Sequence, residues 1–414
     1  MTETDNPISG ASVGKSRMGR GQIAPLLVAF WIGFNIRAPL LGVPPILGLA
    51  RASLHLNYAG AGAVAALPIL AFGIMAFPGA ALVRRVGGYQ VVGVGLVVAA
   101  LGELGRALPG GTLPLFLGTA VMGGGIAIAQ PGLPAIWQKW FAGRVQLASV
   151  TATLGITVGE VVGASITAPL LLPWLHRWQE TMVFWGLLGL SCIPIWLFGV
   201  PRDGAGMAGE TKWDLHQLFL NPRLWAIYVL FAGQSLVYFS ANTWIPTSVG
   251  GGPHSALASL SLATLNGVMV PADVLLILLA RPFATRRWFY VLSAVVALLG
   301  TGGWLLFGNR APLLFAALIG IGVALSFAGL LAYPAVVAAP ARVASLTAAM
   351  LTVGYVGAFL GPLLGGVALD LGGGRRSPFI PITVAAALMV VAALVAPVGG
   401  TAGGDAGLPA AIRA

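Results

Sequence analysis

Residues 23–50 read IAPLLVAFWIGFNIRAPLLGVPPILGLA, and Arg37 is the only charged residue among them. A stretch of this length is long enough to cross a ~30 Å hydrocarbon layer as a helix. Counting about 14 residues from its start, at roughly 1.5 Å each, places Arg37 ~20 Å deep. A cation there costs on the order of 3 kcal/mol unless it faces water or a counter-ion, and arginine does not lose its proton. Arg37 therefore indicates either a pathway for something negative or electron-rich, or a structural arginine that snorkels or pairs with a buried acid.

The composition places the whole chain in a membrane. Of 414 residues, 58% are hydrophobic and 8% are charged, and the mean hydropathy is +0.92. A soluble domain carries about 25% charged residues. The net charge of +11 does not indicate nucleic-acid binding, because the basic residues sit at the ends of apolar stretches. The single cysteine, Cys192, excludes a disulfide and makes a thiolate metal site implausible.

Apolar stretches long enough to span a bilayer recur along the chain. We expect twelve, at 23–50, 57–83, 89–108, 113–138, 145–172, 179–200, 223–249, 256–280, 287–307, 312–338, 343–369 and 379–398. The longest polar connection, 201–222, follows the sixth and divides the chain into two sets of six. The expected organisation is thus an N-terminal tail (1–22), a six-helix bundle (23–200), a central loop (201–222), a second bundle (223–398) and a C-terminal tail (399–414).

Basic residues decide the expected orientation, because cytoplasmic loops carry the excess of Lys and Arg. With the N-terminus inside, fifteen basic residues are cytoplasmic and six are outside, and Arg37 belongs to neither set. The outer set is Arg51, Arg106, Arg177, Arg310, Arg375 and Arg376. Both termini and the central loop are therefore predicted to be cytoplasmic.

The two halves carry matching signals. Glycines recur every four residues in the fifth span (Gly155, Gly159, Gly163) and again in the eleventh, at positions 357, 361 and 365. Small residues at that spacing line one helix face and let another helix approach closely. Basic pairs follow both the second and the eighth spans, at 84–85 and 286–287. This echo indicates a repeated six-helix unit, an arrangement known from one large transporter fold.

Several segments resemble a known family. The loop GAALVRRVG at 79–87 resembles, in degenerate form, the signature loop of the major facilitator superfamily, with Arg84 where an acid is usual. More specific segments are NIRAP at 35–39 with GVPP at 42–45, GIAI at 125–128 with LP at 133–134, GQSLVYF at 233–239 with WIP at 244–246, and GY at 354–355 with GPLLG at 361–365 and Asp370. They resemble the first, fourth, seventh and eleventh helices of the cyanate permease and 2-nitroimidazole transporter group (CynX/NimT). The resemblance implies a secondary transporter of small, often anionic or polar aromatic solutes.

Polar residues within spans are the candidates for substrate binding. Arg37 is the first, because its planar fork presents several donors, whereas Asn35 points about 160° away on an ideal helix. Gln234 and Tyr238 share one face of the seventh span, the repeat counterpart of the first. The alternative for this pair is hydrogen bonding between helices without substrate contact. Gln130 and Asn266 are weaker candidates, and Tyr355 is a candidate to stack on a flat substrate.

Acids within spans are the candidates for proton coupling. Glu160 lies mid-span beside the glycine face, where burial favours the neutral carboxyl. Its two open roles are a proton site and a permanent counter-ion for Arg37. Asp273 is a second proton candidate, with a water-exposed position near the cytoplasmic mouth as the alternative. For Glu103, three residues before Arg106, we expect a local ion pair near the outer surface.

Further residues are candidates for gating. Pro39, with Pro44 and Pro45, is expected to bend the first span. The family motifs add Arg84, Arg85, Gly87, Gly361 and Pro362.

The sequence thus predicts an all-α integral membrane protein with twelve helices in two pseudo-symmetric bundles of the major facilitator type. We expect a monomeric secondary transporter in a bacterial inner membrane, without cofactor or metal, moving a small anionic or polar planar solute by alternating access, alone or coupled to protons. The alternatives are an efflux permease for another substrate and a non-transporting sensor. The chain lacks a phosphate-cradling GxxxxGK[ST] loop, which excludes ATP driving within it, and it shows no clustered catalytic residues, so an enzyme is not expected.

Overall fold

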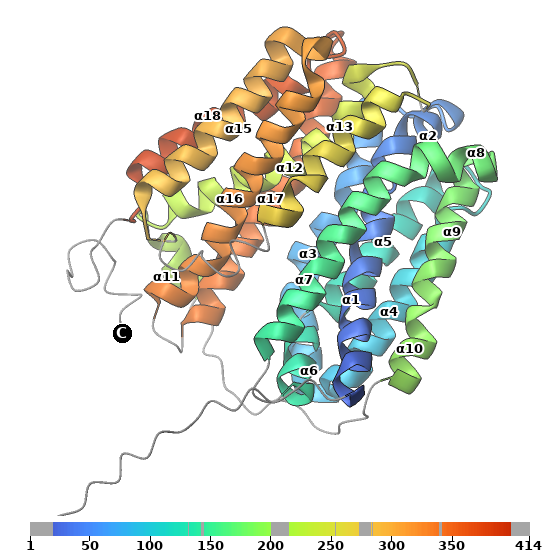
Figure 1. Cartoon of the computed structure of the whole chain (residues 1–414), viewed down its shortest axis with the longest axis vertical. Coiled ribbons are helices and arrows are strands. Elements are labelled where there is room, and N and C mark those ends of the chain that lie inside the picture. The colour runs from blue at the N-terminus through green and yellow to red at the C-terminus, as the bar shows by residue number, and fades with distance from the viewer. Residues whose placement is uncertain are drawn as a thin grey trace, which may run out of the picture.

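The chain folds into helices that run in similar directions through the molecule (Figure 1). This computed structural model describes residues 20–130, 132–141, 145–199, 215–252, 254–272, 283, 285–338 and 342–398. In Figure 1 the elements up to α10 gather on the right and those from α11 onward on the left.

The described part of the N-terminal half contains ten α-helices, one 3₁₀ turn (η1) and one π-helical turn (η2). They are α1 (Arg20–Leu41), η1 (Pro44–Ile46), α2 (Leu47–Ser53), α3 (Tyr58–Val86), α4 (Gly88–Gly105), α5 (Thr112–Ala129), α6 (Gly132–Trp140), α7 (Val145–Ile166), η2 (Thr167–Leu171), α8 (Leu172–Leu175), α9 (Trp178–Leu190) and α10 (Cys192–Gly199). The elements described in the C-terminal half are α11 (Leu215–Leu220), α12 (Trp225–Val249), α13 (Ala256–Gly267), α15 (Arg287–Phe307), η3 (Gly308–Arg310), α16 (Pro312–Val337), α17 (Val343–Asp370) and α18 (Phe379–Val395).

Each of the twelve stretches expected from hydropathy contains helix in its described part, and residues 273–280 of the eighth lie outside that part. Among the described residues, nine helical segments are long and apolar enough to cross a membrane, and Ala256–Ala272 and Phe379–Val395 are shorter apolar helices. The expected fourth and sixth spans are each divided into two helices, between Ala129 and Gly132 and at Ser191.

Prolines explain two irregularities. The expected bend in the first span lies at Pro44 and Pro45, which form the 3₁₀ turn η1, whereas Pro39 stays inside α1. In the fifth span, Pro169 lies within the π-helical turn η2. Proline cannot donate a backbone hydrogen bond, so regular α-helical bonding is replaced by a tighter 3₁₀ turn in the first span and by a wider π turn in the fifth.

Glycine seams join equivalent helices in the two halves. In the first half, a methyl group at Gly155, Gly159 or Gly163 of α7 would overlap the carbonyl oxygen of Phe30, Phe34 or Ala38 on α1, respectively. In the second half, Gly357 of α17 lies on the carbonyl of Ala232 of α12, whereas Gly361 and Gly365 lie on the side chains of Ser240 and Trp244. The predicted close approach of helices at both glycine repeats is therefore confirmed.

The halves meet along α3 and α17, and also along α7 and α13. Glycines again set the spacing, because Gly62 of α3 lies on the backbone of Pro362, and Gly366 of α17 lies on the backbone of Tyr58. Packing of backbone on backbone leaves no room for side chains, so this interface is close at the Tyr58 end of α3.

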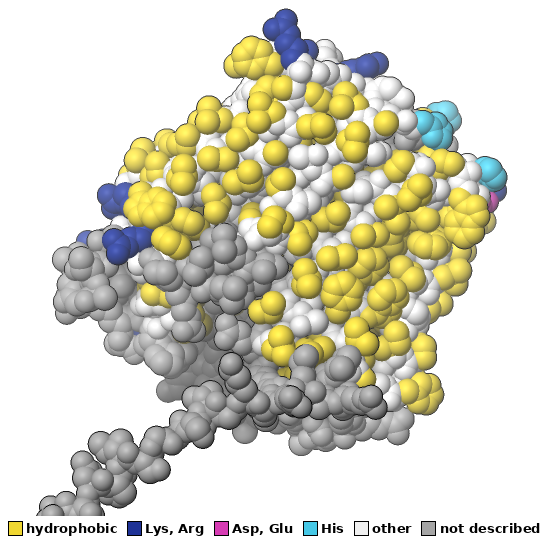
Figure 2. Space-filling view, viewed as in Figure 1, with side chains coloured by type: hydrophobic (Ala, Val, Ile, Leu, Met, Phe, Trp, Pro, Cys, Tyr) yellow, Lys and Arg dark blue, Asp and Glu magenta, His cyan; other side chains and the backbone are white. Residues whose placement is uncertain are grey.

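The face of the molecule seen in Figure 2 is apolar over its middle. Figure 2 shows hydrophobic side chains over the middle of the visible face, while Lys and Arg gather at its upper and lower left edges. On α15 the exposed residues Leu292, Leu299 and Leu306 repeat every seven positions. A continuous apolar band of this kind suits a lipid environment.

The glycine seam leads to a prediction for stability. Gly159→Ala should destabilise the protein by about 1–3 kcal/mol, because the new methyl group forces α1 and α7 apart. Thermal unfolding of purified protein in detergent measures the change. Gly124→Ala is the matched control, since no atom lies within 4 Å of a Cβ built there. Alanine also favours a helix over glycine, so this control should be neutral or slightly stabilising. Equal shifts for the two variants would contradict the seam.

Candidate functional site

Arg37 lies on the face of α1 that is turned toward α7 and α3. Its Nε atom is 3.5 Å from Oε1 of Glu160, and the two side chains are 14% and 9% exposed. The guanidinium carbon lies 5.6 Å from the centre of the Phe72 ring on α3. An aromatic face attracts a cation, so Phe72 adds to the attraction of Glu160. Of the two proton candidates, only Glu160 falls among the described residues, because Asp273 lies outside them.

The Arg37 guanidinium is only partly satisfied. Nε and Nη1 are buried and donate no hydrogen bond to any described residue. A buried donor without a partner costs about 1–3 kcal/mol, and more when it is charged. A solute that offers acceptor atoms would therefore be stabilised at Arg37.

Aromatic and amide groups complete the surroundings of Arg37. The Phe72 and Tyr355 rings meet edge to face, with centroids 5.7 Å apart. Tyr355 also hydrogen-bonds Gln130, the residue that caps α5, and it lies within electrostatic reach of Arg37. Because Tyr355 belongs to α17, the site draws on both halves of the chain. Phe72 was not among the residues predicted from the sequence, since an apolar ring in an apolar span gives no signal.

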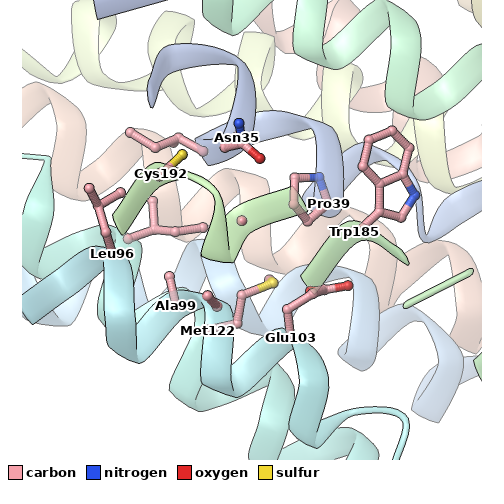
Figure 3. A pocket seen from close by; sticks show the side chains of 12 residues that line it. Asn35, Pro39, Leu96, Ala99, Glu103, Met122, Trp185 and Cys192 are labelled. Atoms are coloured by element: carbon pink, nitrogen blue, oxygen red, sulfur yellow. The ribbon is translucent and has the colours of Figure 1, made fainter. Parts of the chain in front are cut away.

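Asn35 lies on the opposite side of α1. Its Nδ2 donates to the carbonyl of Trp31 at 2.9 Å, and its Oδ1 is buried without a partner. It lines a cavity of about 20 Å³ together with Pro39, Glu103 and residues of α5, α9 and α10 (Figure 3). The structure therefore does not bring Asn35 together with Arg37.

Glu103 forms the expected ion pair with Arg106. Arg106 Nη1 donates to Oε2 of Glu103 at 2.6 Å. Both side chains are buried, 2% and 1% exposed, at the end of α4. Arg106 Nη1 also lies 3.3 Å from the sulfur of Met122, and the glycine at 118 makes room for its side chain. The pair fills a gap between α4 and α5.

The polar stripe of α12 forms a network with α13. Tyr238 donates its hydroxyl hydrogen to Oδ1 of Asn266 at 2.8 Å, and Asn266 Nδ2 donates to Oδ1 of Asn242 at 2.8 Å. Gln234 accepts a hydrogen bond from Ser235 at 3.0 Å. All five side chains are buried. Tyr238 and Asn266, predicted as separate candidates, are thus direct partners that tie two helices together.

A carboxylate closes one end of the interface between the halves. Asp370, at the end of α17, accepts hydrogen bonds from the backbone N–H groups of Tyr58 and Ala59 at 2.9 and 2.8 Å. These are the first residues of α3, where the helix dipole favours an anion. Arg51 lies 4.0 Å above the Tyr58 ring, and Trp244 Nε1 donates to the carbonyl of Pro362 at 3.0 Å.

The remaining gating candidates lie at helix ends and seams. Gly87 has a φ of +101° between α3 and α4, a conformation that suits glycine. Arg85 is exposed there, and the side chain of Arg84 lies outside the described residues. Gly361 and Pro362 contact α12 and α3, as described above. In the part of the chain that the structure describes, no three His, Cys, Asp or Glu side chains group as a metal site would require.

The helical architecture and the glycine seams correspond to a known family. The sequence profile of the Major Facilitator Superfamily matches residues 25–362. The chain belongs to this superfamily.

Curated relatives of this superfamily member confirm the predicted resemblance. The cyanate transport protein CynX of Escherichia coli is 28% identical over 358 residues, which are 84% of this chain and 90% of CynX. The 2-nitroimidazole transporter of the same organism is 27% identical over 390 residues, or 92% and 97% of the two chains. The uncharacterized transporter YycB of Bacillus subtilis is 27% identical over 370 residues, or 87% and 89%. These relatives are transporters, and the chain is a multi-pass membrane protein.

Solved structures show the same fold. A bacterial homologue of the human lysosomal transporter Spinster, in an inward-facing and unoccupied conformation, gives a TM-score of 0.73 at 16% identity, over 92% of this chain and 98% of that one. A mutant of the nucleoside transporter NupG gives 0.73 at 15% identity, over 89% and 99%.

The buried pair in this superfamily member yields a prediction. Glu103→Gln should lower stability by about 3–5 kcal/mol, because it leaves the Arg106 charge buried and unpaired. The double variant Glu103→Leu, Arg106→Met should recover most of that loss, since an apolar pair needs no partner. Thermal unfolding in detergent compares them, with Glu180→Gln on the exposed first turn of α9 as the control. If Glu103→Gln were as stable as the wild type, an ionised Glu103 would not be needed to stabilise the buried Arg106.

Proposed function

We propose that this chain is a proton-coupled secondary transporter that moves a small anionic or polar planar solute by alternating access. The carrying observation is Arg37, a permanent cation in an apolar span whose Nε and Nη1 are buried and donate no hydrogen bond to any described residue, although Nε lies 3.5 Å from Glu160. In this proposal all twelve helical stretches cross a bacterial inner membrane. Both termini lie in the cytoplasm, as the excess of basic residues on that side supports.

The surroundings of Arg37 favour a flat or linear anion. Arginine recognises planar acceptors with parallel donors, and the Phe72 and Tyr355 rings offer faces and edges beside it. The relatives named for cyanate and for 2-nitroimidazole support this class, because both compounds are small and carry delocalised electrons on acceptor atoms. Gln130 is placed to contact the same solute through its hydrogen bond to Tyr355.

Coupling follows from the position of Glu160. Its contact with Arg37 is 3.5 Å, longer than a charge-assisted hydrogen bond of about 2.7–2.9 Å. An anion that binds Arg37 weakens the hold of the guanidinium on Glu160. The carboxylate then takes up a proton, because a buried carboxylate without its counter-ion favours the neutral form. One proton would thus move with each solute anion, and Asp273 is the second candidate for this role.

Alternating access requires two bodies that rock against each other. The seams α1–α7 and α12–α17 make each half stiff, because their glycines leave no space between the paired helices. In the proposed orientation Asp370 lies at the outer end, where its bonds to α3 hold the halves together. Transport then alternates between a state with this contact and a state in which the outer end opens.

The first functional prediction concerns Arg37. Arg37→Ala should reduce solute affinity by about 10- to 100-fold, because a charged hydrogen bond is worth about 1.5–3 kcal/mol. Arg37→Lys should lie in between, since it keeps the charge and loses the planar fork. Flux of cyanate and of 2-nitroimidazole into proteoliposomes measures the effect, and Arg177→Ala is the control on an exposed arginine. Undiminished flux of either solute in folded Arg37→Ala would contradict the assignment of Arg37 as a solute-binding residue.

The second functional prediction concerns coupling at Glu160. Glu160→Gln resembles the protonated carboxyl, so exchange of solute across the membrane should continue. Accumulation driven by a pH gradient, acidic outside, should be lost. Both are measured in proteoliposomes with the same labelled solute, and Glu180→Gln serves as the control. Normal accumulation in Glu160→Gln would assign coupling elsewhere and leave Glu160 as a counter-ion.

A further inference from the structure

A second cavity lies at one end of the C-terminal half. It measures about 490 Å³ and is formed by the ends of α12 and α15, the start of α18 and the loop 371–378. Its lining residues differ entirely from those around Arg37. We call it the arginine pocket, after Arg375 and Arg376 in its wall.

The two arginines are held in place by helix ends. Arg375 lies against Gly250 and Arg376 against Gly308, the glycines that cap α12 and α15 with φ angles of +76° and +55°. Any side chain at either glycine would meet the guanidinium. Arg376 Nη1 donates to the carbonyl of Leu306 at 3.1 Å. The negative ends of two helix dipoles therefore orient the cations, and each guanidinium has five N–H donors to share.

The pocket has unused capacity for an anion. Arg375 and Arg376 are exposed and contribute two positive charges. The nearest acid along the chain, Asp370, is engaged by the backbone of α3. Ser377 also lines the pocket, and its hydroxyl is buried without a partner, with the residue 7% exposed. A hydroxyl beside two guanidinium groups is a donor set typical of phosphate binding.

The rim of the pocket is apolar on its outer side. Leu306 of α15 and Ile380 of α18 are 70% and 51% exposed, and Ile380 itself lines the pocket. Away from the pocket, exposed aliphatic side chains continue along α15 and α18, including Leu299 and Val384. The cations therefore sit at the border between the polar end of the molecule and its apolar band. A free inorganic anion would make no contact with this apolar surface, whereas the acyl chains of a lipid would pack against it.

We propose that the arginine pocket binds the phosphate headgroup of an anionic phospholipid, whose acyl chains lie along α15 and α18. The headgroup accepts hydrogen bonds from Arg375, Arg376 and Ser377. Bound there, it ties together the ends of α12, α15 and α18. This assignment requires only that the chain lies in a bilayer, so it is independent of the solute and of coupling at Glu160.

Native mass spectrometry of the full chain in detergent tests the proposal, with phosphatidylglycerol as the probe. The wild type should retain bound lipid, and Arg375→Gln, Arg376→Gln should reduce that retention at least five-fold. The matched control, Arg177→Gln, Arg310→Gln, removes two exposed arginines that do not line the pocket and should retain lipid within two-fold of wild type. Equal retention in the pocket variant and the wild type would overturn the proposal.

Two further arms separate the alternatives. Glycerol phosphate and inorganic phosphate, added at the concentration of the lipid, should displace less than a fifth of it. If either displaces it fully, the pocket is a site for free anions and the lipid assignment is wrong. Because Arg376 also caps α15, Arg375→Gln alone carries the test if the double variant does not fold. That single variant should lower lipid retention at least two-fold, and unchanged retention would count against the site.

Discussion

The contact between Arg37 and Glu160 requires helices α1 and α7 of the N-terminal half to pack closely. Arginine keeps its charge at any depth, so a counter-ion or polar ligand must reach it within the protein. Glu160 does so from α7, at 3.5 Å. This requires α7 to approach α1 closely, and the glycine next to Glu160, Gly159, packs directly on the backbone of Phe34. The seam and the charge pair therefore depend on each other. The glycines let α7 approach α1, and this approach brings Glu160 within reach of Arg37.

The second half repeats the seam without the charge. Helices α12 and α17 pack through Gly357, Gly361 and Gly365, as α1 and α7 do through theirs. Where α1 carries a cation, α12 carries neutral amides and hydroxyls that bond to one another and to α13. A satisfied neutral network stiffens a half, whereas a cation with unused donors attracts a ligand. The two halves thus share their geometry and differ in their chemistry, and under the proposed function the solute binds nearer the first half.

Local sequence patterns predicted much of the fold and the pairs within one helix. Hydropathy located the helical stretches, glycine spacing located both seams, and the three-residue interval located the bond between Glu103 and Arg106. Contacts between distant segments left no such trace. Asp370 and Tyr58 are 312 positions apart, and Tyr238 and Asn266 are 28 apart on different helices. Phe72 of α3 and Arg37 of α1 lie on different helices, and hydropathy does not encode which side chains of two helices come together.

The strength of the Asp370 contact matters for how the halves separate. A carboxylate at an exposed helix N-terminus is worth about 0.3–1 kcal/mol, because water competes for it. Asp370 is exposed, so its bonds to Tyr58 and Ala59 break at small cost. Deeper in the interface, Tyr355 of α17 meets Phe72 of α3 and bonds Gln130, within reach of Arg37. A solute bound between Arg37 and Tyr355 would contact both halves at once. Its binding energy would then act on the same interface that the Asp370 contact holds weakly. A solute with different affinities for the state with this contact and the state with an open outer end would shift the equilibrium between them.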